Sequence, residues 1–204
     1  MARINQKLAH DYTDAVFVGV GGCGMNTVSR LRKAGVKGTR TICISRLTEE
    51  QKVEGNDVNR IVLLGTEADP VCYRLSKAPI SSDERAAAEI KIQEALGGAK
   101  KVLLFAGLGG FTGTAIVPVV AAMAKGEAAT LGMVITYPFR LERHRREVAE
   151  KALPSLSGLA DDFMLRKNDD LVDRCPKMPM NEAFGLFDME IAKEIKMEGA
   201  RNEE

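Results

Sequence analysis

Two glycine-rich segments, each lying between an apolar run and a segment of helical period, constrain this chain more than any other feature. Residues 19–26 read GVGGCGMN and follow the apolar run 15–20. Residues 107–115 read GLGGFTGTA and follow the run 101–106. Glycine at such a junction lets the backbone turn tightly and approach an anion, whose charge the amino end of the next helix stabilises. The two segments therefore predict two phosphate-binding loops that hold one nucleotide from both sides.

The glycine spacing leaves two classes of nucleotide site open. The first loop satisfies G-x-G-x-x-G through Gly19, Gly21 and Gly24, which is the pattern of dinucleotide-binding folds. A plain strand-to-helix turn needs fewer than the four glycines found in these six positions. The second loop places Thr112 and Thr114 at a helix start but has no lysine, so it is not a Walker motif. A dinucleotide fold would usually need only the first loop.

Apolar runs alternate with helix-like segments along the chain. Strands are expected at residues 15–20, 39–44, 60–64, 101–106 and 131–136. Helices are expected at residues 24–34, 82–96, 114–125, 143–153 (ending before Pro154) and 181–197. This alternation predicts an α/β fold with a doubly wound, mostly parallel sheet and helices on both faces. Because both loops must reach one site, the strands at 15–20 and 101–106 should lie side by side.

Composition excludes several classes of protein. Lys and Arg number 29 against 28 Asp and Glu, a balance that argues against a nucleic-acid binder. Four arginines, Arg140, Arg143, Arg145 and Arg146, cluster in one segment, but interspersed glutamates indicate a solvated helix start. The four cysteines form no Cys-x-x-Cys pair and the two histidines no metal motif, so no protein-bound metal is expected; Cys43 should be a core residue. No apolar stretch reaches the roughly 20 residues of a membrane span, and the polar amino end predicts a cytoplasmic protein.

The last helical segment carries a pair of residues suited to a purine base. Phe184 and Asp188 are four positions apart and therefore share a helix face. An aromatic ring there can stack on a purine while the carboxylate accepts two N–H bonds, which guanine offers and adenine does not. The alternative is that Phe184 belongs to the core and Asp188 is solvated.

Five motifs in order resemble the tubulin/FtsZ family. Residues 107–118 (GLGGFTGTAIVP) resemble its signature GMGGGTGTGAAP, and residues 19–26 resemble GVGGAGGN. Residues 138–146 (PFRLERHRR) resemble PFxFEGxxR, residues 167–171 (KNDDL) resemble PNDxL, and residues 183–188 (AFGLFD) resemble AFxxAD. The resemblance implies a Rossmann-like GTP-binding domain over residues 15–198, with a polar extension at 1–14 and a frayed tail at 199–204.

The resemblance also implies a role for each matching position. The ligand would be GTP or GDP, with Mg²⁺ as an optional companion of the nucleotide. For the phosphates and the sugar, the implied contacts are Gly22, Gly24, Asn26, Gly110, Thr112, Gly113, Thr114, Glu142 and Arg146. For guanine, they are Asn168, Phe184 and Asp188. The other loop members counted in the site are Gly21, Cys23, Met25, Gly109 and Phe111.

Four departures from the family pattern bear on activity. Ser45-Arg46-Leu47 stands where the family has Asn-Thr-Asp, and residues 66–79 lack the glycines of the γ-phosphate loop. Met25 and Ala115 replace signature glycines. The chain also stops within the helix that begins near residue 181, before the family's acidic hydrolytic loop and second domain. We therefore expect GTP hydrolysis to be slow or to depend on self-association or on a partner that supplies the loop. A filament or cell-division role follows from kinship alone.

Two other functions compete with guanine-nucleotide binding. An NADP-dependent oxidoreductase would use Gly19, Gly21 and Gly24, with Ser45 and Arg46 beside the 2′-phosphate. It leaves the second loop and the Phe/Asp pair unexplained. A pseudo-GTPase that serves only as an interaction module is the other alternative.

Overall fold

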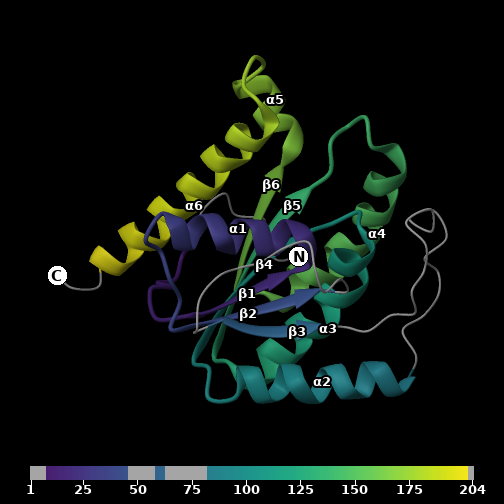
Figure 1. The fold of residues 1–204 in the computed structure, drawn as a ribbon, viewed down its shortest axis with the longest axis vertical. Helices are drawn as coiled ribbons and strands as arrows, with labels where there is room; N and C mark the ends of the chain where they lie inside the picture. Colours follow the sequence, from purple (N-terminus) through teal and green to yellow (C-terminus); the bar gives the residue numbers. More distant parts are fainter. Residues whose placement is uncertain (1–7, 46–57, 63–81, 202–204) are drawn as a thin grey trace.

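The computed structural model describes residues 8–45, 58–62 and 82–201, which contain one six-stranded parallel sheet (Figure 1). The strands are β1 (Val16–Val20), β2 (Arg40–Ser45), β3 (Val58–Val62), β4 (Lys101–Gly107), β5 (Thr130–Tyr137) and β6 (Asp162–Lys167). Their order across the sheet is β3-β2-β1-β4-β5-β6, and all neighbours are parallel. This is a doubly wound sheet, as the alternation of runs predicts.

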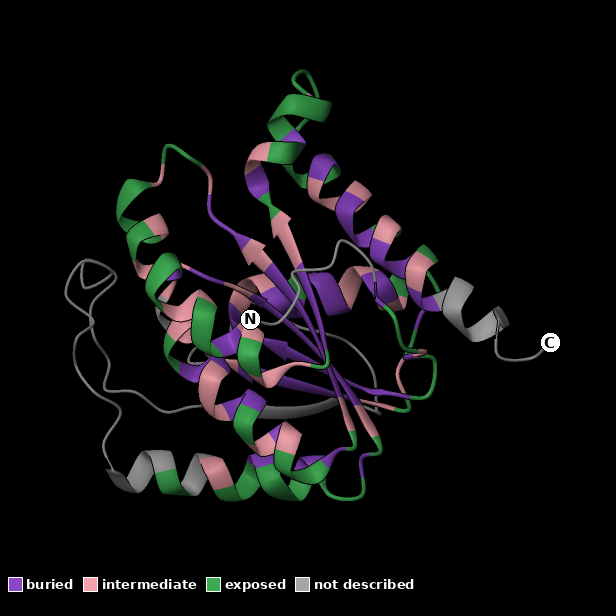
Figure 2. Ribbon diagram, turned by 180° about the vertical axis from the view of Figure 1, so that it is seen from behind, coloured by how far each residue is buried: buried purple, intermediate pink, exposed green. Residues whose placement is uncertain are grey.

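Helices cover both faces of this sheet. They are α1 (Gly21–Lys33), α2 (Ser82–Leu96), α3 (Phe111–Glu127), α4 (Arg143–Leu159), α5 (Asn168–Arg174) and α6 (Met180–Arg201). One buried cluster joins the strands to α2, α3 and α4, and a second joins them to α1 and α6. Figure 2 shows the buried strands between these two layers of half-exposed helices.

The strand sequences explain this burial on both faces. Val16, Val18 and Val20 pack toward α2 and α3, whereas Phe17 packs toward α1 and meets Phe105 of β4 edge-on at 5.5 Å. Successive side chains point to opposite faces, so a strand covered on both sides must be apolar throughout. The continuous apolar runs of the sequence are the consequence.

The elements agree with most of the expected boundaries. Four expected strands match β1, β2, β4 and β5 to within one residue at each end, and the expected helix 82–96 has the bounds of α2. Cys43 is a buried core residue, as expected. The expected loop at 66–79 and the residues Arg46 and Leu47 lie outside the described residues.

One expectation about the second half of the chain is wrong. The helix expected to end before Pro154 continues to Leu159. Proline removes one backbone hydrogen bond, but Ala149 and Leu156 are both buried and pack α4 against the sheet on either side of it. In addition, the sequence predicted neither β6 nor the short helix α5 that follows it.

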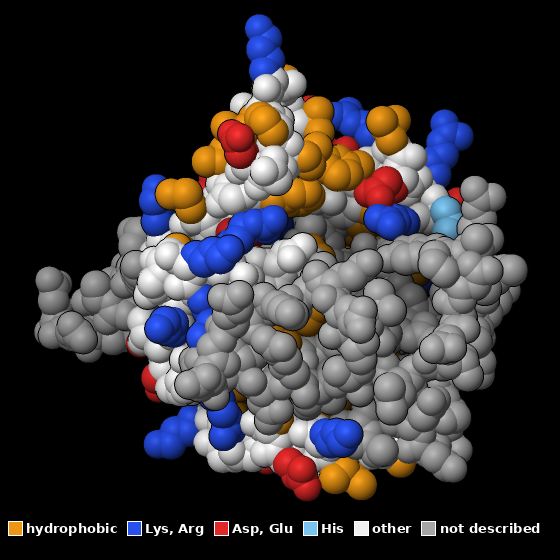
Figure 3. Space-filling model, viewed as in Figure 1, with side chains coloured by type: hydrophobic (Ala, Val, Ile, Leu, Met, Phe, Trp, Pro, Cys, Tyr) orange, Lys and Arg blue, Asp and Glu red, His pale blue; other side chains and the backbone are white. Residues whose placement is uncertain are grey.

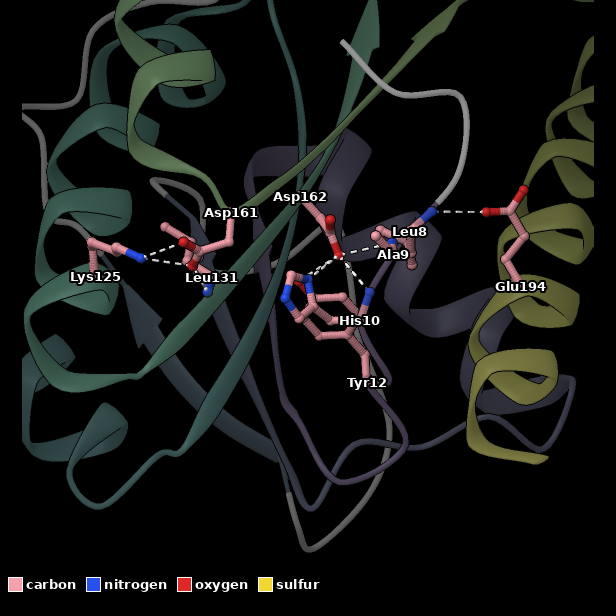
Figure 4. A network of polar contacts seen from close by, with 9 residues as sticks. All are labelled: Leu8, Ala9, His10, Tyr12, Lys125, Leu131, Asp161, Asp162 and Glu194. Carbon is pink, nitrogen blue, oxygen red and sulfur yellow. Dashed lines mark hydrogen bonds and ion pairs between the residues drawn. The ribbon is translucent and has the colours of Figure 1, made fainter. Parts of the chain in front are cut away.

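The segment before β1 is tied to the start of β6 through one buried carboxylate (Figure 4). Asp162 is 1% exposed, and its Oδ2 accepts N–H bonds from Ala9 and His10 at 3.0 and 2.9 Å. The same oxygen accepts the Tyr12 hydroxyl at 3.1 Å and lies 2.9 Å from the His10 ring. Burial, and then the neighbouring charge of Asp162, raises the pKa of Tyr12. This network lies at the amino ends of the strands, opposite the glycine loops.

Candidate nucleotide-binding site

The two glycine loops follow neighbouring strands. β1 pairs with β4 in parallel, with Val20 opposite Ala106, so both loops begin at the same edge of the sheet. The strand order reverses at this pair, because β2 lies on one side and β5 on the other. Ligands of open α/β sheets bind in the crevice at such a switch point. The predicted adjacency of the two loops is therefore confirmed.

Backbone contacts explain why glycines are needed beside this crevice. A Cβ on Gly24 would lie 2.0 Å from the carbonyl oxygen of Phe105, so α1 can approach β4 only without a side chain there. A Cβ on Gly113 would lie 1.9 Å from the carbonyl oxygen of Gly107. Distances this short are forbidden to real atoms, so both helices sit as close to the strand ends as backbone allows.

Both helix starts leave backbone N–H groups available for an anion. α1 and α3 begin within the loops, and neither has a side-chain cap or an acidic residue in its first turn. The loops also adjoin, because a Cβ on Gly21 would lie 3.4 Å from the Cβ of Thr112. Two uncapped helix amino ends at one crevice give a site of positive potential suited to phosphates.

The side chains of the loops have separate placements. The half-buried loop residues are Gly22, Cys23, Gly109, Gly110, Thr112 and Thr114. The buried ones are Gly21, Gly24, Met25 and Gly113, and Asn26 is exposed. Thr114 Oγ1 accepts the N–H of Gly109 at 2.9 Å and so holds the second loop in shape. Met25 packs against Cys43 of β2. Phe111 is the first residue of α3. In the first loop, burial raises the pKa of the Cys23 thiol.

The carboxylate predicted to read the base lies between α6 and α1. Asp188 is only 5% exposed, and its Oδ2 accepts a hydrogen bond from Arg30 Nη1 at 2.8 Å. Burial raises the pKa of Asp188, while bonds from Arg30 and Thr27 partly oppose the rise. Phe184, one helical turn earlier, is half-buried and meets the ring of Phe139 edge-on at 6.4 Å. The alternative of a solvated Asp188 is thus wrong.

Asn168 adds an unsatisfied acceptor at the same edge of the sheet. It is the first residue of α5, directly after β6, and it is 8% exposed. Its Oδ1 is buried and has no hydrogen-bond partner in the described structure. Buried acceptors are nearly always paired, so this oxygen is suited to a donor on a ligand.

The two predicted sugar and phosphate contacts from α4 are already held in place. Glu142 accepts the N–H of Phe139 at 3.0 Å and pairs with Arg145 at 2.7 Å. Arg146 pairs with Asp169 at 2.9 Å, and its guanidinium lies 4.9 Å from the centre of the Tyr137 ring. These contacts fix the loop after β5 against the start of α5.

Sequence reasoning missed three residues that support these side chains. Thr27 and Arg30 contact Asp188, and Asp169 pairs with Arg146. The spacing of Thr27 and Arg30, three residues apart on the helix that the first loop opens, was the available signal. Asp169 lies within the KNDDL motif, where only the asparagine was given a role.

The outer surface near this edge combines paired charges and exposed apolar side chains. Arg140 and Arg146 pair with Asp169, and Arg145 with Glu142. Figure 3 shows hydrophobic side chains gathered over α5 and the amino end of α6. The exposed large hydrophobic residues of α5, of α6 and of the segment between them are Val172, Met178, Met180 and Met189. Within the described ranges, no group of three or more metal-binding side chains occurs and no helix has the length and apolarity to cross a membrane.

Comparison with known proteins identifies the family. The model of the Tubulin/FtsZ family, GTPase domain, matches residues 14–176. The chain therefore belongs to the tubulin/FtsZ family. The strand order alone also fits a dinucleotide-binding fold, but membership of this family sets the oxidoreductase alternative aside.

Similar sequences include proteins named as cell division proteins. The chain is 36% identical to "Cell division protein FtsZ 2" of Methanocaldococcus jannaschii over 184 residues, which cover 89% of this chain and 47% of that protein. It is 35% identical to "Cell division protein FtsZ 1" of Pyrococcus abyssi over 180 residues, which cover 88% of this chain and 48% of that protein. The chain thus spans about half the length of these relatives.

Solved structures share the fold. A W319Y mutant of FtsZ from M. jannaschii superposes with a TM-score of 0.69 at 28% identity, covering 90% of this chain and 56% of that one. CetZ2 from Haloferax volcanii, described as a GTPγS-bound protofilament, gives 0.65 at 20% identity and covers 87% and 55%. At 20% identity, the similarity to CetZ2 shows only that the two proteins share a fold.

Proposed function

We propose that this chain binds a guanine nucleotide, GTP or GDP, in the crevice after β1 and β4. The observation that carries the proposal is the buried carboxylate of Asp188, which lies on α6 beside the helix that opens the first glycine loop. A buried carboxylate is costly unless donors surround it, and the guanine edge supplies two N–H donors. The unpaired Oδ1 of Asn168 supplies a further acceptor for the base.

The phosphates would lie against the amino ends of α1 and α3. Gly21 and Gly22 present backbone N–H groups from the first loop, and Gly110 and Thr112 present theirs from the second. Phe184 would stack on the purine, while Glu142 and Arg146 reach the sugar and phosphates. Mg²⁺ would bind through the phosphates, because a nucleotide itself supplies oxygen ligands of the kind that this ion prefers.

We further propose that GTP hydrolysis is slow in the isolated chain and depends on self-association or a partner. Hydrolysis needs a group that orients the attacking water, and no described residue can be assigned that role. The exposed methionines Met178 and Met180, close together in sequence at the start of α6, offer an apolar surface for such association. The names of the archaeal relatives support a cell-division role, in the cytoplasm, as part of this proposal.

Two experiments test these proposals. Nucleotide released from freshly purified protein should be GDP or GTP, and calorimetric titration should give tighter binding of GDP than of ADP or NADPH. Equal binding of GDP and ADP, or tight NADPH binding that Arg46→Ala abolishes, would contradict the proposal. Binding of no nucleotide would favour the interaction-module alternative. Phosphate release that is rapid without a partner and does not depend on protein concentration would contradict slow hydrolysis.

A further inference from the structure

We propose that Arg30 is a positioning residue that keeps Asp188 ionised and correctly oriented, so that the site accepts a guanine edge and rejects an adenine edge. The inference rests on the proposed function and adds a mechanism of base selectivity to it. Arg30 and Asp188 lie 158 positions apart in sequence, yet Nη1 and Oδ2 are 2.8 Å apart. The pair joins the helix that opens the first phosphate loop to the helix that carries the base-reading residues.

The carboxylate keeps hydrogen-bond acceptors for the base beside the arginine. A carboxylate offers about four acceptor positions on its two oxygens. Arg30 and Thr27 both bond to Asp188 from α1, which leaves acceptor capacity for two N–H groups of guanine. The Arg30 side chain is 34% exposed while that of Asp188 is 7% exposed. The arginine therefore reaches from the surface to a carboxylate that water barely touches.

The charge of Asp188 decides which base fits. An ionised carboxylate only accepts hydrogen bonds and suits the N1–H and amino group of guanine. A neutral carboxyl group carries its own proton, which would meet a donor on guanine but could be donated to N1 of adenine. Loss of the negative charge would therefore weaken GDP binding and reduce the discrimination against ADP.

Burial pushes Asp188 toward the neutral form, and Arg30 opposes it. Burial is the largest influence on the pKa of Asp188 and raises it. The groups that face the carboxylate are Arg30, Thr27 and Cys23 on α1 and Arg166 on β6. Among these, Arg30 has the strongest lowering effect, since it both bonds to the carboxylate and carries a positive charge. Its removal should leave the effect of burial largely unopposed.

The test is the pH dependence of GDP and ADP affinity in Arg30→Met. Wild-type affinity for GDP relative to ADP should change little between about pH 6 and 8.5, because the phosphates of the two nucleotides titrate alike. In Arg30→Met it should be at least about tenfold weaker at pH 6 and recover toward the wild-type value at pH 8.5, because each unit below the carboxyl pKa costs tenfold in the ionised form. The preference for GDP over ADP should shrink at pH 6 and return at pH 8.5. Arg30→Lys keeps the charge and should restore a flat profile.

Arg32→Met is the matched control. Arg32 lies on the same helix and donates to Thr41 Oγ1 at 3.1 Å, away from Asp188. This variant should follow the wild-type pH profile. An Arg30→Met affinity that matches the wild type, or that is weakened by the same factor at every pH, would overturn the inference.

The outcomes separate this inference from the proposed function. If wild-type protein shows no preference for GDP, the proposed function fails and the inference fails with it. If wild-type protein prefers GDP and Arg30→Met keeps that preference at all pH values, only the inference fails. If Arg30→Met does not fold, the pH dependence of the Asp188 carboxyl ¹³C chemical shift is measured in labelled wild-type protein, with Asp188→Asn used to assign the signal. A titration midpoint above about pH 7 overturns the inference, and a lower one supports it.

Discussion

Replacing Asp188 by asparagine should abolish base selectivity without destabilising the protein. Asparagine offers one acceptor oxygen and turns a donor toward a guanine N–H, so at least one donor of the base loses its partner in a buried place. A buried donor left unpaired costs about 1–3 kcal/mol, which corresponds to about a tenfold to hundredfold loss of GDP affinity. ADP affinity should stay the same or rise, because the neutral amide, like a neutral carboxyl group, can donate to N1 of adenine. Calorimetric titration of both nucleotides against wild-type and Asp188→Asn protein measures the difference.

The stability of the same variant provides the control. The folded-state pKa of Asp188 is raised above its ordinary value of 3.8. A carboxyl group with a raised folded-state pKa contributes stability below its unfolded pKa and loses that contribution as pH rises through the folded value. At neutral pH the ionised Asp188 therefore lowers the stability of the folded state. Arg30 is partly exposed, so water can solvate its guanidinium group when Asp188 is replaced. The melting temperature of Asp188→Asn at pH 7 should equal or exceed that of the wild type.

A fall in melting temperature together with equal losses for GDP and ADP would refute this reasoning. Such a result would mean that Asp188 holds α1 and α6 together and does not recognise the base. Phe184→Ala provides a second comparison: stacking does not read the base edge, so this change should weaken GDP and ADP binding alike.

Three further substitutions test the account at other places. Asp162→Ala leaves the buried Tyr12 hydroxyl and two part-buried N–H groups without their acceptor and should cost about 1–3 kcal/mol in urea unfolding, whereas the exposed Asp161→Ala should cost less; equal losses would contradict the network's role. Gly113→Ala should prevent GDP binding or folding, because its Cβ meets a backbone oxygen at 1.9 Å, whereas a Cβ at Gly126, near the far end of the same helix, finds open space and Gly126→Ala should be tolerated. Glu190 has a pKa lowered by its bond from Arg174, so its contribution to stability should be present above about pH 4.5 and lost as pH falls further. With half of the Arg174 side chain exposed, Glu190→Gln should cost no more than about 1 kcal/mol at pH 7, and the cost should shrink as the pH falls below about 4.5; a cost that does not depend on pH would count against the ion pair.

The parts of the fold that follow from local sequence were predictable. The continuous apolar runs of β1 and β4 indicate strands covered on both faces, and the glycines after them indicate loops that approach phosphates. The neighbouring position of these strands followed from one functional requirement, that two phosphate loops serve one ligand. The four-residue spacing of Phe184 and Asp188 placed both on one helix face of α6.

The unpredicted parts depend on contacts between residues far apart in the chain. β6 begins with Asp162 and contains Arg166, so its sequence is too charged to indicate a buried strand. Asp162 accepts a hydrogen bond from His10, about 150 positions away, and Arg166 donates one to Glu190 on α6. The contact of Arg30 with Asp188 likewise arises only when α1 and α6 pack on the same face of the sheet.

The central claim is that one guanine nucleotide bridges the two glycine loops and α6. A structure of the protein determined with GDP tests it most directly. The phosphates should lie against the amino ends of α1 and α3, with the guanine N1–H and amino group bonded to Asp188 and a base atom bonded to Asn168. A GDP molecule bound elsewhere, or one whose base lies away from Asp188 while its phosphates occupy only the first loop, would contradict the claim.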